Sequence, residues 1–110
     1  MKLPNAETAV VEIDKLRDYC LSFSHVRGRH KARVFQSALG LTATHADELR
    51  AALLAAVRAE EATLTEADDY GQRYVVDFTM SRADRTARIR SSWIIRVGEN
   101  VPRLTSCFVM

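Results

Sequence analysis

Apolar residues recur every three or four positions in the first half of the chain, which is the spacing of one helix face. This pattern predicts a short helix over residues 15–21, with Asp14 as its N-cap. It predicts a second helix over Arg29–Leu39. Gly40 should end that helix, because glycine readily adopts the left-handed conformation found just after helices. The β-branched segment 9–13 is expected to be extended.

A third and more regular helical pattern follows Thr44, which is a suitable N-cap residue. Leu49, Leu53 and Val57 fall on one face, and the alanine-rich run 51–59 has high helix propensity. After this run the chain becomes polar and acidic. We interpret residues 63–71 as a connector.

Beyond Gly71 the period of the apolar residues changes from 3.6 to 2, which predicts strands. The strands cover residues 74–80, 86–97 and 103–108, with a hairpin turn at 98–100. Helices followed by antiparallel strands are typical of an α+β fold. We therefore predict one domain over residues 1–110, in which N-terminal helices pack on one face of a C-terminal antiparallel β-meander.

The two faces of the predicted sheet differ in chemistry. The face that carries Trp93, Ile95, Leu104 and Phe108 should lie under the helices. The opposite face carries Arg88, Arg90, Ser92, Arg96, Arg103 and Thr105. A four-residue loop would place Arg96 beside Arg103 and Ile94 beside Thr105. Because like charges directly opposite destabilise a sheet, such an arrangement requires screening by water or an anion bound between the arginines.

Composition limits the class of protein. Hydrophobic residues make up 47% and charged residues 27%, which are ordinary values for a globular domain. No apolar run approaches the roughly 20 residues that span a bilayer, and no secretory signal is evident, so we expect a cytoplasmic protein without membrane contact. Cys20 and Cys107 are expected to be reduced thiols. No ligand spacing indicates a metal site, and we expect no cofactor.

Positive charge gathers at the predicted start of the second helix. Residues 25–33 contain four Arg or Lys and no acid. A helix N-terminus with free N–H groups and nearby cations favours phosphate. His30 adds a side chain that titrates near neutral pH, beside Lys31. An exposed basic loop with a partly packed His30 is the alternative interpretation.

Metal-free cleavage of RNA needs a base, an acid and a cation that stabilises charge on phosphorus. The candidates for these roles are His30 (or His25), Lys31, Arg90, Arg103 and Thr105. Further phosphate contacts are assigned to Arg27, Arg29, Arg33, Arg88, Ser92 and Arg96. Two other interpretations stay open. The sheet face is a solvated surface, or the domain is a non-catalytic module that docks an acidic protein.

Five segments resemble an uncharacterised bacterial domain family: residues 3–7, 15–21, 28–35, 88–95 and 101–105. Members of that family occur alone and at the C-termini of phage head-morphogenesis-like and polymorphic-toxin proteins. The resemblance implies a toxic or effector activity. It also implies a fold like that of the barnase, EndoU, colicin and RelE ribonucleases, with RNA or an acidic antitoxin-like protein as partner.

The resemblance marks five positions of the family pattern: Lys31, Arg90, Trp93, Arg103 and Thr105. The chain departs from the family at its end. Relatives place a small residue, a tyrosine and a proline in the last strand, where this chain has Ser106-Cys107-Phe108-Val109-Met110. If that tyrosine contributes to the family's site, the site of this chain is altered.

Overall fold

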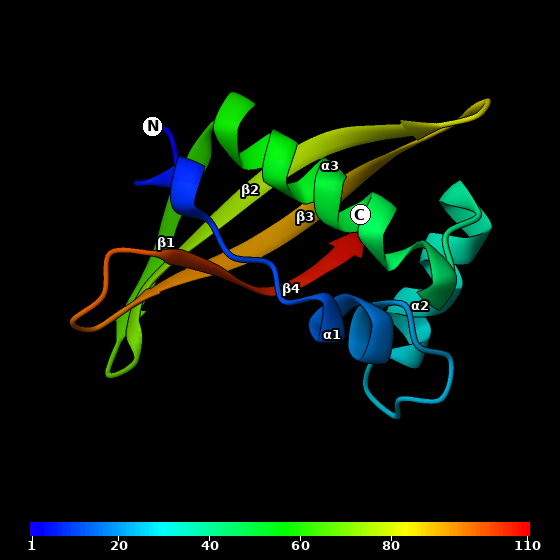
Figure 1. The fold of residues 1–110 in the computed structure, drawn as a ribbon, viewed down its shortest axis with the longest axis horizontal. Coiled ribbons are helices and arrows are strands. Elements are labelled where there is room, and N and C mark those ends of the chain that lie inside the picture. The colour runs from blue at the N-terminus through cyan, green and yellow to red at the C-terminus, as the bar shows by residue number, and fades with distance from the viewer.

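The second half of the chain forms a four-stranded antiparallel sheet in a computed structural model that describes residues 1–110. The strands are β1 (Ala62–Asp68), β2 (Gly71–Arg82), β3 (Arg85–Arg96) and β4 (Pro102–Val109), and their order in the sheet is their order in the chain (Figure 1). This meander confirms the predicted sheet and adds one strand to it.

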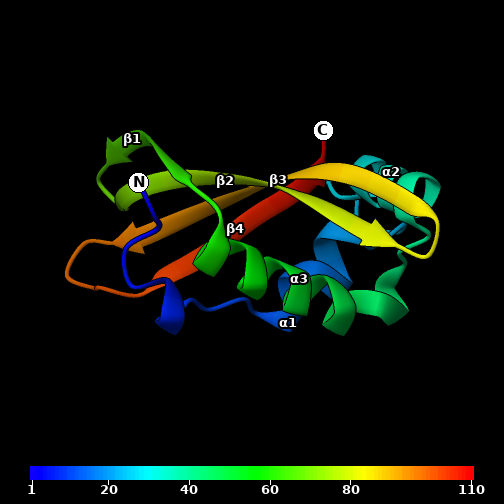
Figure 2. The same cartoon turned by 90° about the horizontal axis from the view of Figure 1, so that it is seen from above.

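The first half is helical. The α1 helix (Ile13–Lys15) continues into a π-helical segment, Leu16–Cys20, and α2 covers Arg29–Leu39. A 3₁₀ turn, Ala43–His45, leads into α3 (Ala46–Ala59), and a further 3₁₀ turn covers Ala6–Thr8. Figure 2 shows α1 and α3 on one side of the sheet and α2 at the end where the β2–β3 hairpin lies. The predicted α+β class is confirmed.

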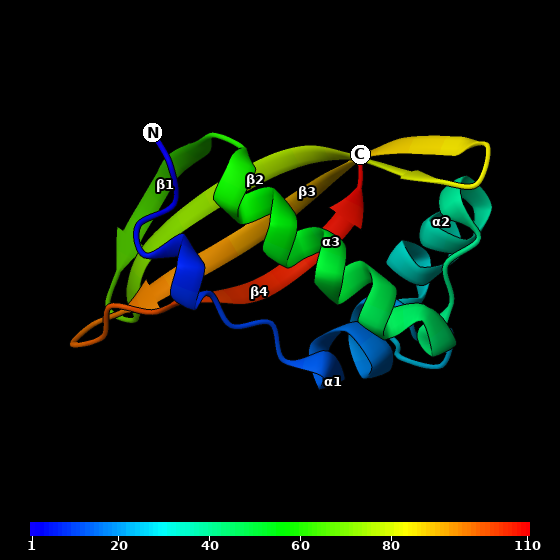
Figure 3. The same cartoon turned by 45° about the horizontal axis from the view of Figure 1, so that its top comes forward.

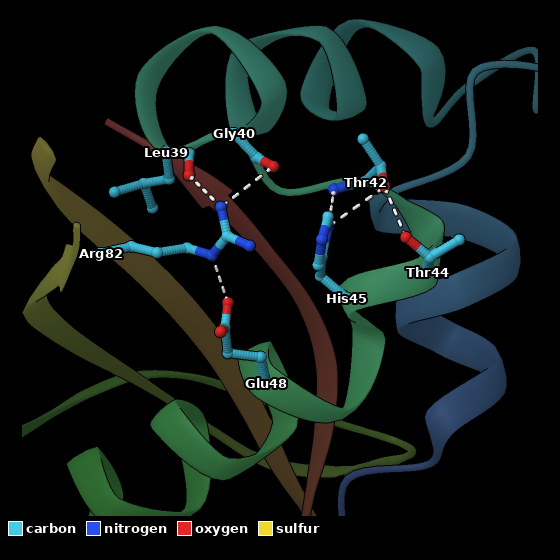
Figure 4. A network of polar contacts seen from close by, with 7 residues as sticks. All are labelled: Leu39, Gly40, Thr42, Thr44, His45, Glu48 and Arg82. Carbon is cyan, nitrogen blue, oxygen red and sulfur yellow. Dashed lines mark hydrogen bonds and ion pairs between the residues drawn. The ribbon is translucent and has the colours of Figure 1, made fainter.

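Two predicted helix starts were wrong. The first helix begins at Ile13, so Asp14 lies inside it rather than at its cap. Ahead of α3, the capping residue is Thr42 and not Thr44. The N–H of Thr42 donates to Nδ1 of His45 at 3.0 Å, and the Thr42 hydroxyl lies 3.1 Å from the same nitrogen (Figure 4). Gly40 has a φ of 68°, which confirms it as the residue that ends α2.

Residues 63–71, which we interpreted as a connector, instead contain most of β1. Only Ala62 of this strand is buried. Neither face of an exposed edge strand is buried. Its apolar and polar residues therefore need not alternate, and the sequence pattern does not reveal the strand.

The register between β3 and β4 also differs from the prediction. Ile94 lies opposite Arg103, and Arg96 has no partner on β4. Trp93 pairs with Leu104 whereas Ser92 pairs with Ser106, so Thr105 is the extra residue of a β-bulge.

The bulge reverses the alternation along the end of β4. Cys107 is therefore fully buried and Phe108 only half-buried, the opposite of the prediction. Ile94, predicted on the polar face, is 6% exposed. Its register neighbours on the two adjacent strands are Arg73 and Arg103. Val97, predicted to face inward, lies past the end of β3 and is exposed.

One continuous core fills the space between the helices and the sheet. It joins Phe35 of α2 and Leu53 of α3 to Trp93, which confirms that tryptophan as a core residue. Ser91 is the one buried polar side chain. Its hydroxyl donates to the carbonyl of Val76 at 2.7 Å and accepts the indole N–H of Trp93 at 2.9 Å. Both groups are thus satisfied without water.

The N-terminal segment covers part of the β4 edge. Val10 forms a parallel bridge with Arg103, which agrees with the extended conformation predicted for residues 9–13, although Ile13 already begins α1. Its N–H donates to the carbonyl of Pro102 at 2.9 Å, and its carbonyl accepts from Leu104 at 3.0 Å.

Candidate anion-binding site between α2 and the sheet

The start of α2 is held against the π-helical segment by a close backbone approach. A Cβ at Gly28 would lie 2.0 Å from the carbonyl oxygen of Tyr19, so only glycine fits without movement. The turn before it is fixed by His25, whose Nδ1 accepts the N–H groups of Arg27 at 3.1 Å and Gly28 at 3.0 Å. Because Nδ1 is an acceptor, the imidazole carries its proton on Nε2.

Lys31 is the central cation of the site. Its Nζ donates to the hydroxyl of Ser106 at 2.8 Å and contacts the hydroxyl of Tyr19 at 3.5 Å. The same ammonium lies 4.9 Å from the centre of the Tyr19 ring, a cation–π distance. The side chain is half-buried, so the charge is partly withdrawn from water while one of its three protons stays free for a ligand.

A hollow of about 460 Å³ lies on the side of the first helix, and Tyr19 separates it from Lys31. Tyr19, His25 and Thr105 line it, together with Asp14, Lys15 and Asp18. The Tyr19 and His25 rings meet edge to face, with centroids 4.6 Å apart.

The two carboxylates of that hollow share one arginine of the chain. Arg17 contacts Asp14 at 2.7 Å and Asp18 at 3.0 Å. The hydrogen bond from Arg17 lowers the pKa of Asp18, so both partners stay charged at neutral pH.

Two buried thiols lie beneath Lys31. Cys20 and Cys107 are free and fully buried, and the fold brings them together from opposite ends of the chain. A hydrogen bond from Cys107 outweighs burial and, with the Lys31 charge and the Ser106 hydroxyl, lowers the pKa of the Cys20 thiol to about 6. The shared hydrogen bond and burial raise the pKa of Cys107. Neither sulfur reaches solvent, so neither thiol can meet a substrate.

His30 lies on the other side of Lys31. These two residues line a hollow of about 320 Å³ with Val34, Phe108 and Val109. His30 is exposed and makes no hydrogen bond within the chain, so both of its ring nitrogens are available. The two histidines therefore flank the lysine in separate hollows.

The predicted sheet arginines are largely paired with partners of their own. Arg90 forms a two-pronged pair with Asp77, at 2.9 Å for each hydrogen bond. These bonds lower the pKa of Asp77. Arg103 contacts Glu99 at 3.2 Å, and Arg88 donates to the Thr79 hydroxyl at 3.1 Å. Arg96, at the far end of β3, is exposed.

Thr105 and Ser92 are joined across the bulge. The Thr105 hydroxyl donates to the carbonyl of Ser92 at 3.1 Å, so its own proton is already engaged. Both residues line a hollow of about 360 Å³ on the open face of the sheet, with Arg73 and Ser106. Arg27, Arg29 and Arg33 are exposed and form no ion pair.

Of the predicted residues, the structure brings Lys31 and His30 together along the seam between α2 and β4, whereas Thr105 lines the separate hollow beside Tyr19. It leaves Arg90 and Arg103 in separate ion pairs. Sequence reasoning missed Tyr19 and Ser106. Tyr19 could have been found from the sequence, because a tyrosine on the apolar face of a helix places its hydroxyl at the edge of the core. Ser106 could not, since the bulge decides where it lies.

No three His, Cys, Asp or Glu side chains come together as a group that could hold a metal ion. None of the helices combines the length and apolarity needed to cross a bilayer.

Comparison with known proteins shows the family of this chain. No match was found among the curated proteins. A family model described as a domain of unknown function (DUF6883) matches residues 2–110, and the chain therefore belongs to that family.

Proposed function

We propose that this domain is a metal-independent ribonuclease-like effector that binds and cleaves RNA at the Lys31 site. The observation that carries the proposal is the convergence on Lys31 of two hydroxyls, Tyr19 and Ser106, between two imidazoles. A half-buried ammonium with hydroxyls and histidines around it suits a phosphate diester whose charge rises during reaction.

The chemistry assigns each group one task. The 2′-hydroxyl attacks phosphorus and loses its proton to a base, while the 5′-oxygen leaves and takes up a proton. The products are a 2′,3′-cyclic phosphate and a 5′-hydroxyl. His30 takes the proton of the 2′-hydroxyl as the base, and the Lys31 ammonium gives a proton to the 5′-oxygen as the acid. The Nε2–H of His25 donates to a phosphate oxygen and stabilises the added charge.

The test is incubation of the purified protein with total RNA, with and without EDTA. Cleavage that survives EDTA and disappears in Lys31→Ala and His30→Ala supports the proposal. Arg58→Ala is a suitable control, because Arg58 is exposed on α3, away from the seam. Intact RNA at every pH, or equal cleavage by all variants, rules out this site.

Two observations favour a second function, a non-catalytic module that docks an acidic protein such as an antitoxin. Arg90 and Arg103 are already paired with carboxylates, and His25 and His30 do not share a hollow. The pH dependence separates the two functions. Catalysis needs one protonated and one unprotonated group and gives a bell-shaped profile, whereas docking does not.

A further inference from the structure

The edge of β2 is open beyond the point where β1 begins. The two strands pair only from Ala62 opposite Val76 to Asp68 opposite Gly71, whereas β2 continues to Arg82. Figure 3 shows β2 running on past β1 toward the hairpin tip, with α3 alongside. Over this stretch the sheet has an edge that no strand of the chain covers.

The ladder pattern identifies the peptide groups at this open edge. In antiparallel strands, neighbouring residues turn their N–H and C=O to opposite sides. Met110 donates its N–H to the carbonyl of Arg88. The peptide groups of Arg88 therefore point toward β4, and those of Ile89 point toward β2. Phe78 lies opposite Ile89, so its peptide groups point toward β3. It follows that the peptide groups of Asp77, Thr79 and Ser81 point outward, and no backbone bond outside the sheet uses them.

A groove runs along this edge. It has a volume of about 440 Å³, and its walls are β2 on one side and α3 on the other. Phe78 and Met80 contribute apolar surface from the strand. The helix contributes the short side chains of Ala52, Ala55, Ala56 and Ala59. A strand laid beside β2 would find backbone partners on one side and space for apolar side chains over the alanines.

The charges at the two ends of the groove differ. Glu48 is neutralised, because it forms an ion pair with Arg82, whose Nη1 also donates to the carbonyls of Leu39 and Gly40 (Figure 4). Glu60 is exposed, lies just after the last residue of α3 and forms no ion pair. Lys2 already donates to the carbonyl of Ala59 at this end of the helix, so the charge of Glu60 itself is what remains to attract a cation.

We infer that this groove binds an extended protein segment as an additional antiparallel strand, in line with β1. The segment alternates apolar and polar residues and carries a lysine or arginine that meets Glu60. Its apolar side chains point toward α3, and its polar side chains lie on the face of Asp77 and Thr79. The groove borders β2, whereas the Lys31 site adjoins β4, so the two sites are independent.

The experiment pans displayed random peptides of about seven residues, slightly longer than a typical strand, on the immobilised protein. Enriched peptides are then synthesised and their affinities measured by fluorescence anisotropy. We expect alternating apolar residues and one basic residue in the enriched set. Sequences without alternation, or no enrichment, overturn the inference.

The variants make the test specific to the groove. Thr79→Pro removes an outward N–H and should weaken binding roughly fivefold to tenfold, the effect of one lost backbone hydrogen bond. Leu64→Pro is the control, because it places proline on an outer edge away from the groove. Equal binding by Thr79→Pro and the unmodified chain overturns the inference.

Two further substitutions keep the test decisive if a proline disturbs folding. Ala55→Leu fills the groove and should abolish binding, whereas Ala51→Leu, on the same helix but outside the groove, should not. Glu60→Lys should reverse the preference from basic to acidic peptides. If size-exclusion chromatography instead finds a dimer that Thr79→Pro dissolves, the occupant is a second copy of the chain and the inference is wrong.

Discussion

Gly28 links the sequence of the basic turn to the position of Lys31. Its φ of −89° is open to any residue, so the requirement for glycine is steric and comes from the Tyr19 carbonyl. We expect Gly28→Ala to lower the free energy of unfolding by about 1–3 kcal/mol, as overpacking does.

Urea denaturation measures this change. Gly98→Asn is the matched control, since Gly98 has open space around it and asparagine tolerates its φ of 80°. That variant should stay within about 0.5 kcal/mol of the unmodified chain. Equal effects at the two glycines would contradict the steric argument.

Asp77 gives a pH dependence of predictable sign. Hydrogen bonds from Arg90 hold its pKa below the usual value near 3.8. A carboxyl with a lowered folded-state pKa stabilises the fold above its unfolded pKa, and this contribution is lost as the pH falls through the lowered value. We therefore expect the stability advantage of the unmodified chain over Asp77→Asn to be full near neutral pH and to shrink below pH 3.8.

Denaturant midpoints measured between neutral and strongly acidic pH check this expectation. The comparison with Asp77→Asn is needed because Asp18 and Asp68 have lowered pKa values as well and also affect the acid limb. A constant difference between the two proteins across this range would show that the pair with Arg90 has no pH-linked effect on stability.

At the scale of elements, the start of α3 depends on Thr42. The hydrogen bonds between Thr42 and His45 close the turn ahead of the helix, whereas the hydroxyl of Thr44 contacts only that of Thr42 (Figure 4). Loss of an N-cap typically lowers stability by about 1 kcal/mol. We expect a decrease of that size for Thr42→Ala.

Thr44→Ala is the matched control for this cap and should change stability by less than about 0.5 kcal/mol. Thermal unfolding of the two variants measures the difference. A larger effect at Thr44 would mean that the cap suggested by the sequence pattern alone is the correct one.

The elements that the sequence predicted are those with a strong period and a buried face. The α2 helix, the alanine-rich α3 and the strand around Trp93 all meet that condition. The bulge at Thr105 could not be predicted, because one extra residue in a strand leaves no mark in the hydrophobic pattern. The bulge places Cys107 in the core and Ser106 next to Lys31. The wrong register predicted for β4 therefore also concealed the contact between Ser106 and Lys31.

At the scale of the whole molecule, the cations fall into two groups. Arg27, Arg29 and Arg33 are free around the start of α2, whereas Arg90 and Arg103 are paired on the sheet. Binding of single-stranded nucleic acid releases counterions, and log K falls with log salt by about 0.7 for each phosphate that the protein neutralises. The two groups should therefore contribute unequally to the salt dependence of RNA binding.

We expect Arg29→Ala to reduce the slope for a single-stranded RNA oligonucleotide by about 0.7, the share of one phosphate contact. Arg103→Ala should leave the slope nearly unchanged, because a cation already neutralised by Glu99 releases few counterions. Fluorescence anisotropy over a series of salt concentrations measures both slopes. Equal losses at the two arginines would mean that RNA displaces the carboxylate and extends over the sheet. A slope near zero for the unmodified chain would leave α2 without a phosphate contact and would favour the protein-docking function.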